Sequence, residues 1–181
     1  MQKSYFFKFQ ISNFKFLFYK VKLIYMKVQT HLFGEVNVSE DKIITFPKGL
    51  IGDFFEGKTK FMLIHEEDKN QQNHFSYTLQ SVEDGECALQ IINPTVFGFH
   101  YELELTDEEN ALLKNPQSED VIFMQTIYKV EPVSGESNSK GSLATNLRAP
   151  LIINVKERVG IQKLIEKMNT DVVFSNLTEN V

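Results

Sequence analysis

Short alternations of apolar and polar residues recur along the chain, separated by clusters of turn-forming residues. Residues 35–38, 75–80 and 101–105 alternate most cleanly, as a strand with one buried face does. Other segments are rich in β-branched and aromatic residues, which favour strands. The predicted strands are 28–33, 35–38, 43–46, 60–65, 75–80, 87–92, 101–105, 121–130 and 151–153. This succession of short strands predicts a mostly β domain.

One short helix is predicted among the strands. Thr106 is followed three residues later by Glu109, which is the spacing of a capping box. Asp107 and Glu108 fall in the first turn, where the helix dipole favours anions, and Pro116 ends the helix. The pattern as a whole predicts a single barrel or sandwich with a helical insert.

Residues 159–168 fit two different structures. Apolar side chains recur there with the i, i+3, i+4, i+7 spacing of a helix, at Ile161, Leu164, Ile165 and Met168. Gly160 could equally mark a turn after the preceding strand. The residues alone leave helix and strand open.

The longest compact apolar run in the C-terminal third is Leu151–Ile153, directly after Pro150. Proline cannot donate to a β-ladder, so Pro150 is expected at the start of a strand or on an edge. Asn146, Arg148 and Asn154 place polar groups on both sides of this strand. They are either the flanks of a core strand or part of a protein-binding surface.

Charge separates the first 25 residues from the rest of the chain. The 181 residues include 19 basic and 24 acidic side chains. Residues 1–25 hold five lysines and no acid, so residues 26–181 keep 14 basic and 24 acidic side chains, a net charge of about −10. Such a body repels nucleic-acid phosphates and suits a basic protein partner.

Residues 1–25 also differ in composition. Lysines interrupt their nine aromatic residues, so the unbroken apolar core of a secretory signal is missing. Phe, Lys, Ile, Asn and Tyr, whose codons are rich in A and T, supply 17 of the 25 residues. We expect Met26 to be the true start and residues 1–25 to be translated upstream sequence. The alternative is a segment that lies on an anionic membrane surface.

Patterns typical of catalysis or metal binding are missing from the sequence. The four histidines, His31, His65, His74 and His100, lack metal-site spacing. The single cysteine, Cys87, lies in an apolar strand and is expected to be an inert core thiol in a reducing compartment. No run of 18 apolar residues occurs, so no membrane span is predicted.

Four phenylalanines lie near glycines in predicted loops: Phe54, Phe55, Phe97 and Phe99. They either fill the core at the ends of loops or form an apolar patch for a partner.

Five motifs, in order, resemble those of the bacterial flagellar assembly factor FliW family. They are Phe33–Val36, Ile43–Leu50, Leu79–Asp84, Ile91–Pro94 and Asn146–Asn154. The resemblance covers residues 26–181 and leaves residues 1–25 as an extension without counterpart. The chain departs from the family pattern at Gly52–Glu56, at His100 and in a longer loop at 134–142.

The resemblance implies a small antiparallel β-barrel-like single domain with one short helix and a strand near Val159–Ile165. It also implies a cytoplasmic, non-enzymatic regulator without cofactor or metal. Such a regulator binds CsrA, a basic RNA-binding repressor, and relieves its repression of flagellin translation; it also binds flagellin. Two alternatives are a flagellin chaperone that does not bind CsrA and a small-molecule enzyme built on a β-barrel.

Four residues are expected to contact the partner. Glu102 and Glu104 alternate with apolar neighbours, which should direct both carboxylates away from the core. Asn146 and Arg148 are polar at positions where a purely structural strand needs neither an amide nor a charge.

Overall fold

The computed structural model describes residues 25–65, 76–98, 103–130, 142–165 and 171–174. Their strands are β1 (Tyr25–Thr30), β2 (Gly34–Ser39), β3 (Ile43–Thr45), β4 (Lys60–Ile64), β5 (Ser76–Ser81), β6 (Ala88–Ile92), β7 (Val121–Val130), β8 (Ser142–Asn146), β9 (Leu151–Asn154), β10 (Val159–Gln162) and β11 (Asp171–Phe174). Helix α1 spans Asp107–Leu112, and the short 3-10 helices are η1 (Glu40–Lys42), η2 (Asp53–Phe55), η3 (Pro94–Phe97) and η4 (Ser118–Asp120). Within these ranges, no helix has the length and apolar content needed to cross a membrane.

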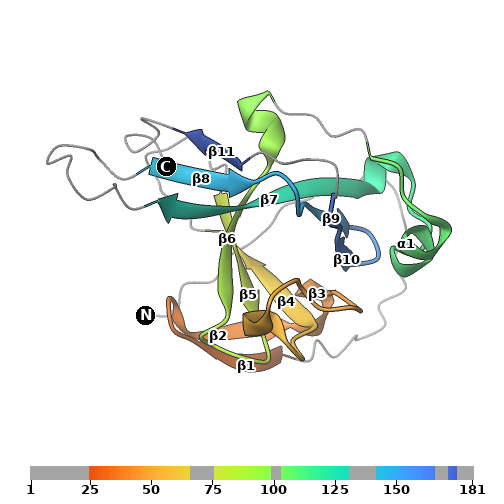
Figure 1. Cartoon of the computed structure of the whole chain (residues 1–181). Helices are drawn as coiled ribbons and strands as arrows, with labels where there is room; N and C mark the ends of the chain where they lie inside the picture. The colour runs from red at the N-terminus through yellow and green to blue at the C-terminus, as the bar shows by residue number, and fades with distance from the viewer. Residues whose placement is uncertain (1–24, 66–75, 99–102, 131–141, 166–170, 175–181) are drawn as a thin grey trace, which may run out of the picture.

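Seven strands close into a barrel (Figure 1). Pairing runs from β3 through β4, β5, β6 and β7 to β9 and β10, and β10 returns to β3. Every pairing is antiparallel except the last, in which Val159 of β10 lies opposite Thr45 of β3 in parallel orientation. The expected barrel with one α-helix is therefore confirmed, with a parallel seam where β10 meets β3.

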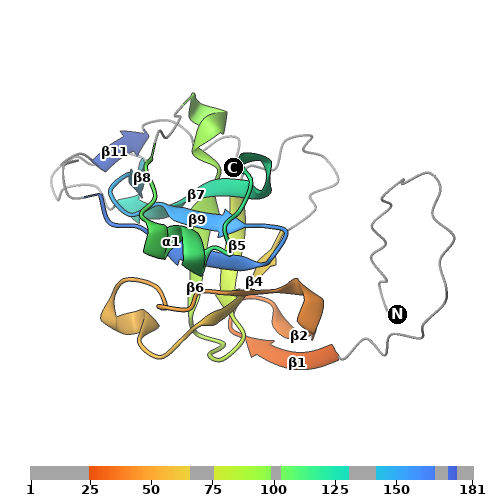
Figure 2. The ribbon, with the colours of Figure 1, turned by 90° about the vertical axis from the view of Figure 1, so that its right-hand side faces the viewer.

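The long strand β7 belongs to two sheets. Its first part, Val121–Met124, pairs with β9 inside the barrel, whereas Ile127–Val130 pairs with β8. Strand β8 pairs in turn with β11. Figures 1 and 2 show these three strands extending beyond the barrel.

The barrel core is centred on two phenylalanine rings. Phe46 and Phe61 are fully buried and meet edge to face, with ring centroids 5.5 Å apart. Gly160 lies inside β10, and a Cβ built on it would lie 2.5 Å from Cε1 of Phe46. Glycine is therefore required at position 160 by the close approach of the Phe46 ring, and it does not mark a turn.

Helix α1 covers a second cluster formed by Leu113, Ile152, Val159 and Ile161 with their half-buried neighbours. The predicted capping box is confirmed: the amide of Glu109 donates to Oγ1 of Thr106, and the amide of Thr106 donates to Oε2 of Glu109. At the other end, Nδ2 of Asn154 donates to the carbonyl oxygen of Leu113 over 2.8 Å.

Strands β1 and β2 form a separate two-stranded ribbon at one end of the barrel (Figure 2). Val28 and Val38 of the ribbon pack with Met62 of β4. The amide of His31 donates to the carbonyl oxygen of Gly85. Gly85 also lies so close to the ribbon that a Cβ added to it would be 2.2 Å from the backbone oxygen of Gln29. The ribbon thus rests directly on the β5–β6 turn.

The predicted strand 101–105 is wrong for its described part. Residues 103–106 precede α1 without entering a strand, and residues 101–102 lie outside the described ranges. Alternation nevertheless holds, since Leu103 and Leu105 pack against the cluster beneath α1 while Glu104 is exposed. An irregular segment that covers a core can alternate in burial without forming a hydrogen-bonded ladder.

The ambiguity at residues 159–168 is settled as a strand for 159–162, as the resemblance implied. Ile161 pairs with Ile152 of β9 and is buried in the cluster beneath α1. The helical spacing was therefore a wrong indication here. Met168, together with His74, Phe99, His100 and residues 134–141 of the predicted loop, lies outside the described ranges.

Candidate partner-binding surface

Of the two carboxylates expected to contact the partner, the structure describes Glu104 and not Glu102. Glu104 is exposed in the segment before α1, and no strand holds it there. Glu102 lies outside the described ranges. Within the described ranges, no hydrogen bond or ion pair joins Glu104 to Asn146 or Arg148. The sequence-predicted contact residues are thus not gathered into one site by the described contacts.

Asn146 and Arg148 shape the turn between β8 and β9, residues 147–149. Oδ1 of Asn146 accepts a hydrogen bond of 2.9 Å from the amide of Arg148, as an Asx turn requires. Nε of Arg148 is buried and meets no hydrogen-bond acceptor among the described residues. Asn146 therefore has a local structural role, which the sequence argument had not foreseen.

Asn154, the third polar residue beside the apolar run Leu151–Ile153, has a structural role. Its side chain is 1% exposed, and its Oδ1 accepts hydrogen bonds of 3.1 Å from the amides of Lys156 and Glu157. With Nδ2 on Leu113, its amide makes three hydrogen bonds, which join the turn after β9 to the end of α1. For Asn154, the interpretation as a core-strand flank is correct.

Gln162 joins the loop after β3 to the turn after β8, and the sequence did not single it out. Its Oε1 accepts from the amide of Ile51 over 2.8 Å, and its Nε2 donates to the carbonyl oxygen of Ala149 over 3.2 Å. These partners lie far apart in the sequence, so no local pattern could have indicated the contact.

In the loop of residues 50–57, the two adjacent phenylalanines have different environments. Phe55 packs against the barrel core, whereas Phe54 is 54% exposed. Their rings meet edge to face at 5.2 Å, and Nζ of Lys58 lies 5.6 Å from the centroid of Phe54. The core-filling interpretation therefore holds for Phe55, which packs against the core, and is wrong for Phe54, which is exposed to solvent. The side chain of Phe97 lies outside the described part.

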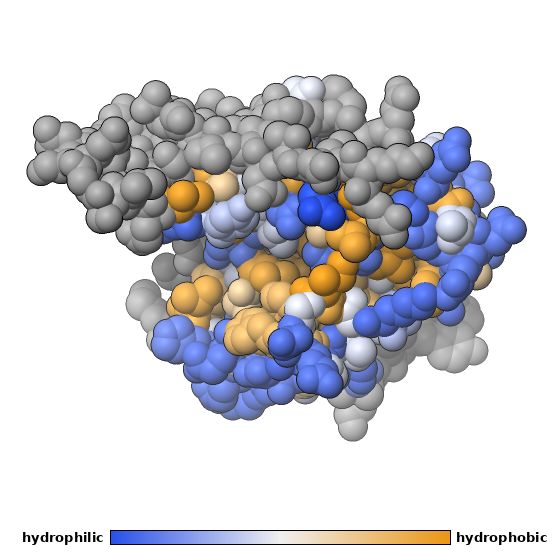
Figure 3. Space-filling view, viewed as in Figure 1, coloured by the Kyte–Doolittle hydropathy of each residue, from blue (hydrophilic) through white to orange (hydrophobic). Residues whose placement is uncertain are grey.

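Two exposed carboxylates flank Phe54. Asp53 and Glu56 are both exposed, and among the described residues neither takes part in an ion pair. Figure 3 shows apolar side chains gathered in a band on the face that carries this loop, with polar side chains around them. Exposed apolar and acidic groups are thus adjacent in this loop.

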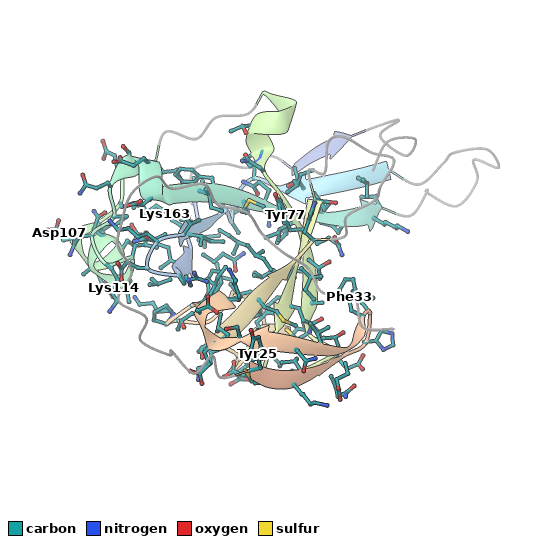
Figure 4. The ribbon with its side chains drawn as sticks, turned by 180° about the vertical axis from the view of Figure 1, so that it is seen from behind. Tyr25, Phe33, Tyr77, Asp107, Lys114 and Lys163 are labelled. Atoms are coloured by element: carbon teal, nitrogen blue, oxygen red, sulfur yellow. The ribbon has the colours of Figure 1, made fainter. Side chains whose placement is uncertain are left out.

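Two of the three acids of α1, Glu108 and Glu109, are paired with lysines. Nζ of Lys163 lies 2.7 and 2.6 Å from the two carboxylate oxygens of Glu109, and Nζ of Lys48 lies 2.5 Å from Oε1 of Glu108. Figure 4 places Lys163 on the same side of the barrel as α1. Partial burial alone would raise the pKa of Glu109, but hydrogen bonds from Lys163 and Thr106 outweigh it and lower the pKa. These acids stabilise the position of the helix.

The described residues offer little for catalysis. No group of three or more His, Cys, Asp or Glu side chains in the described ranges could hold a metal ion. Cys87 is fully buried, and burial raises the pKa of its thiol, which suppresses the reactive thiolate.

Known proteins resemble the chain over most of its length. The family model described as FliW protein matches residues 27–175. A flagellar assembly factor FliW from Azoarcus sp. (strain BH72) is 39% identical over 151 residues, covering 82% of this chain and 97% of that protein. One from Caldicellulosiruptor saccharolyticus is 37% identical over 157 residues, covering 85% and 94%. A crystal structure of the flagellar assembly factor FliW aligns with a TM-score of 0.63 at 25% identity, covering 86% of this chain and all of that one.

Proposed function

Because this chain belongs to the FliW family of flagellar assembly factors, which are not enzymes, we propose that it binds a CsrA-type regulator and flagellin. In the proposed mechanism it withdraws the repressor from flagellin messenger RNA in the cytoplasm. Flagellin competes for the same factor, so that flagellin leaving the cell frees it to act on CsrA. Family membership over residues 27–175 is the observation that carries the proposal.

The charge of the chain supports a basic partner. Residues 26–181 carry a net charge of about −10, and an RNA-binding repressor presents positive charge to phosphates. Opposite net charges accelerate association and select against partners of the same sign. The same charge argues against direct binding of nucleic acid by this chain.

The proposal keeps four partner-contact candidates: Glu102, Glu104, Asn146 and Arg148. Glu104 has the exposed carboxylate that electrostatic steering needs. The half-buried turn of Asn146 and Arg148 would act by direct contact.

A gel-shift competition tests the function. CsrA is bound to flagellin leader RNA, and the full chain is added at rising concentration. We expect the CsrA–RNA complex to dissociate, and the chain alone to leave the RNA unshifted at physiological salt because its charge repels phosphates. Added flagellin should restore the complex. A chain that binds flagellin but leaves the CsrA–RNA complex intact would instead be a dedicated flagellin chaperone.

A second prediction concerns the N-terminal segment. A chain that begins at Met26 is expected to unfold at the same temperature as the full chain and to bind CsrA with the same Kd. The reason is the change in composition at residue 26 and the start of the family match at residue 27. Thermal melts and binding titrations of the two chains make the comparison. A loss of binding on removing residues 1–25 would show that the segment contributes to the interface.

A further inference from the structure

Three large apolar side chains are exposed on the face that carries η2. Ile51 is 50% exposed, Phe54 54% and Leu164 52%. We call them, together with the carboxylates of Asp53 and Glu56, the loop surface. An apolar group of this kind, bordered by charge, is typical of a binding site for another protein.

The loop surface is held in place from below. Phe55 is anchored in the barrel core, and Nζ of Lys58 donates to the carbonyl oxygen of Phe54 over 2.9 Å. Gly52 has φ of +118°, a conformation that side-chain-bearing residues rarely adopt, and its carbonyl oxygen accepts from the amide of Phe55. The exposed ring of Phe54 therefore projects from a fixed loop, which lowers the entropy lost on binding.

Leu164 reaches the same face through β10. The amides of Lys163 and Ile165 donate to the carbonyl oxygens of residues 150 and 148, so the extended chain continues past the end of β10. Alternate residues of an extended chain point the same way, which puts Leu164 on the side of Gln162. Gln162 holds the amide of Ile51. Figures 1 and 2 agree in placing the loop with η2 and the end of β10 on one face.

Charge identifies the kind of partner. Asp53 and Glu56 are exposed on either side of Phe54 and have no ion pair within the described ranges, unlike Glu108 and Glu109 of α1. Two free carboxylates beside three apolar side chains complement a segment that carries lysine or arginine next to apolar residues. The net negative charge of the body acts in the same direction.

We infer that the loop surface docks a basic, amphipathic segment of the partner protein, with Ile51, Phe54 and Leu164 as apolar anchors and Asp53 and Glu56 as steering charges. The inference rests on the proposed function, since CsrA is the basic partner proposed there. It adds to the candidates Asn146 and Arg148 a neighbouring surface, since the amide of Ile165, next to Leu164, donates to the carbonyl oxygen of Arg148.

Single substitutions at the anchors test the docking. Phe54→Ser and Leu164→Ser, each made in the full chain, are expected to weaken binding to purified CsrA at least tenfold, because a few apolar anchors dominate most interfaces. Leu32→Ser is the control matched to Leu164→Ser. It also removes a leucine, at a similar exposure of 56%, but from the segment between β1 and β2. It should leave Kd within twofold of the unmodified chain.

Charge reversal tests the steering role. Asp53→Lys with Glu56→Lys is expected to slow association several-fold at low salt and less at high salt, because exposed charges are screened. Glu119→Lys with Glu157→Lys makes the same change in net charge at two exposed positions. Both lie near the turn from β9 to β10, at the end of these strands away from Gln162. This control should slow association less.

The outcomes separate the inference from the proposed function. If the unmodified chain does not bind CsrA, the proposed function fails and the inference fails with it. If it binds and both anchor variants, folded by thermal melt, bind equally well, the function stands and the loop surface is excluded. Equal weakening by Leu32→Ser, or loss of flagellin binding with CsrA binding intact, would also overturn the inference. Should Phe54→Ser not fold, Leu164→Ser decides alone.

Discussion

Asn154→Asp is expected to be among the most destabilising single-atom changes in this chain, lowering the free energy of unfolding at neutral pH by about 3 kcal/mol. The substitution replaces Nδ2, which donates to the carbonyl oxygen of Leu113, by an oxygen that can only accept. The new carboxylate would be 99% buried, with no cation among the described hydrogen-bond partners of Asn154. The loss combines an unpaired carbonyl with a buried charge that the amides of Lys156 and Glu157 compensate only in part.

Urea unfolding at neutral and acidic pH measures the effect. Below the pH at which the new carboxyl group takes up a proton, it can again donate to Leu113, so the deficit relative to the parent chain should shrink in acid. Asn146→Asp is the control, because its Oδ1 accepts from Arg148 in a half-buried turn and an aspartate can do the same. We expect that change to stay within about 0.5 kcal/mol. Equal effects at the two positions would refute the buried-donor argument.

Gly160→Ala is expected to lower the free energy of unfolding by about 2 kcal/mol, because extra carbon in a filled core forces neighbours to shift. The added Cβ would lie 2.5 and 2.7 Å from two ring atoms of Phe46, which is fully buried. Gly160 does not have a positive φ, so alanine suits its backbone and would by itself stabilise the chain slightly. The steric clash therefore decides the sign.

A double-substitution cycle isolates this contact. Phe46→Leu removes ring atoms from the space that the new methyl group needs, so the combination with Gly160→Ala should be less destabilising than the two single changes added together. We expect a coupling of about 1 kcal/mol, within the range seen for residues in direct contact. Urea unfolding of the four chains supplies the values. Additivity would show that the strand, and not the ring, absorbs the methyl group.

Local patterns predicted elements that depend on neighbours in the sequence. Residues 121–130 were expected as one strand and form β7, and the Thr106–Glu109 capping box is present as predicted. Alternation at 103–105 gave the correct burial and the wrong structure, because burial does not require a hydrogen-bonded neighbour. The role of Gly160 depends on Phe46, which is remote in the chain, so sequence spacing could not reveal it.

The candidate surface was less predictable than the fold. Phe54 and Phe55 are adjacent and chemically identical, and only the geometry of η2 decides which one packs against the core. Asn146 was expected at an interface because it is polar beside a core strand, yet it serves its own turn. The contact of Gln162 with Ile51 joins distant segments, and such contacts leave no periodic trace.

The parallel seam has a consequence for biosynthesis. Thr45 and Val159 pair to close the barrel, so a chain leaving the ribosome cannot complete that closure until its C-terminal part has emerged. Contacts between such distant positions form slowly, because a long loop must be ordered first. The early strands β3 to β6 can pair one after another during synthesis, but the edge of β3 stays open until β10 arrives. Folding of this protein should therefore finish after translation, and the open edge of β3 is where a nascent chain is most exposed to mispairing.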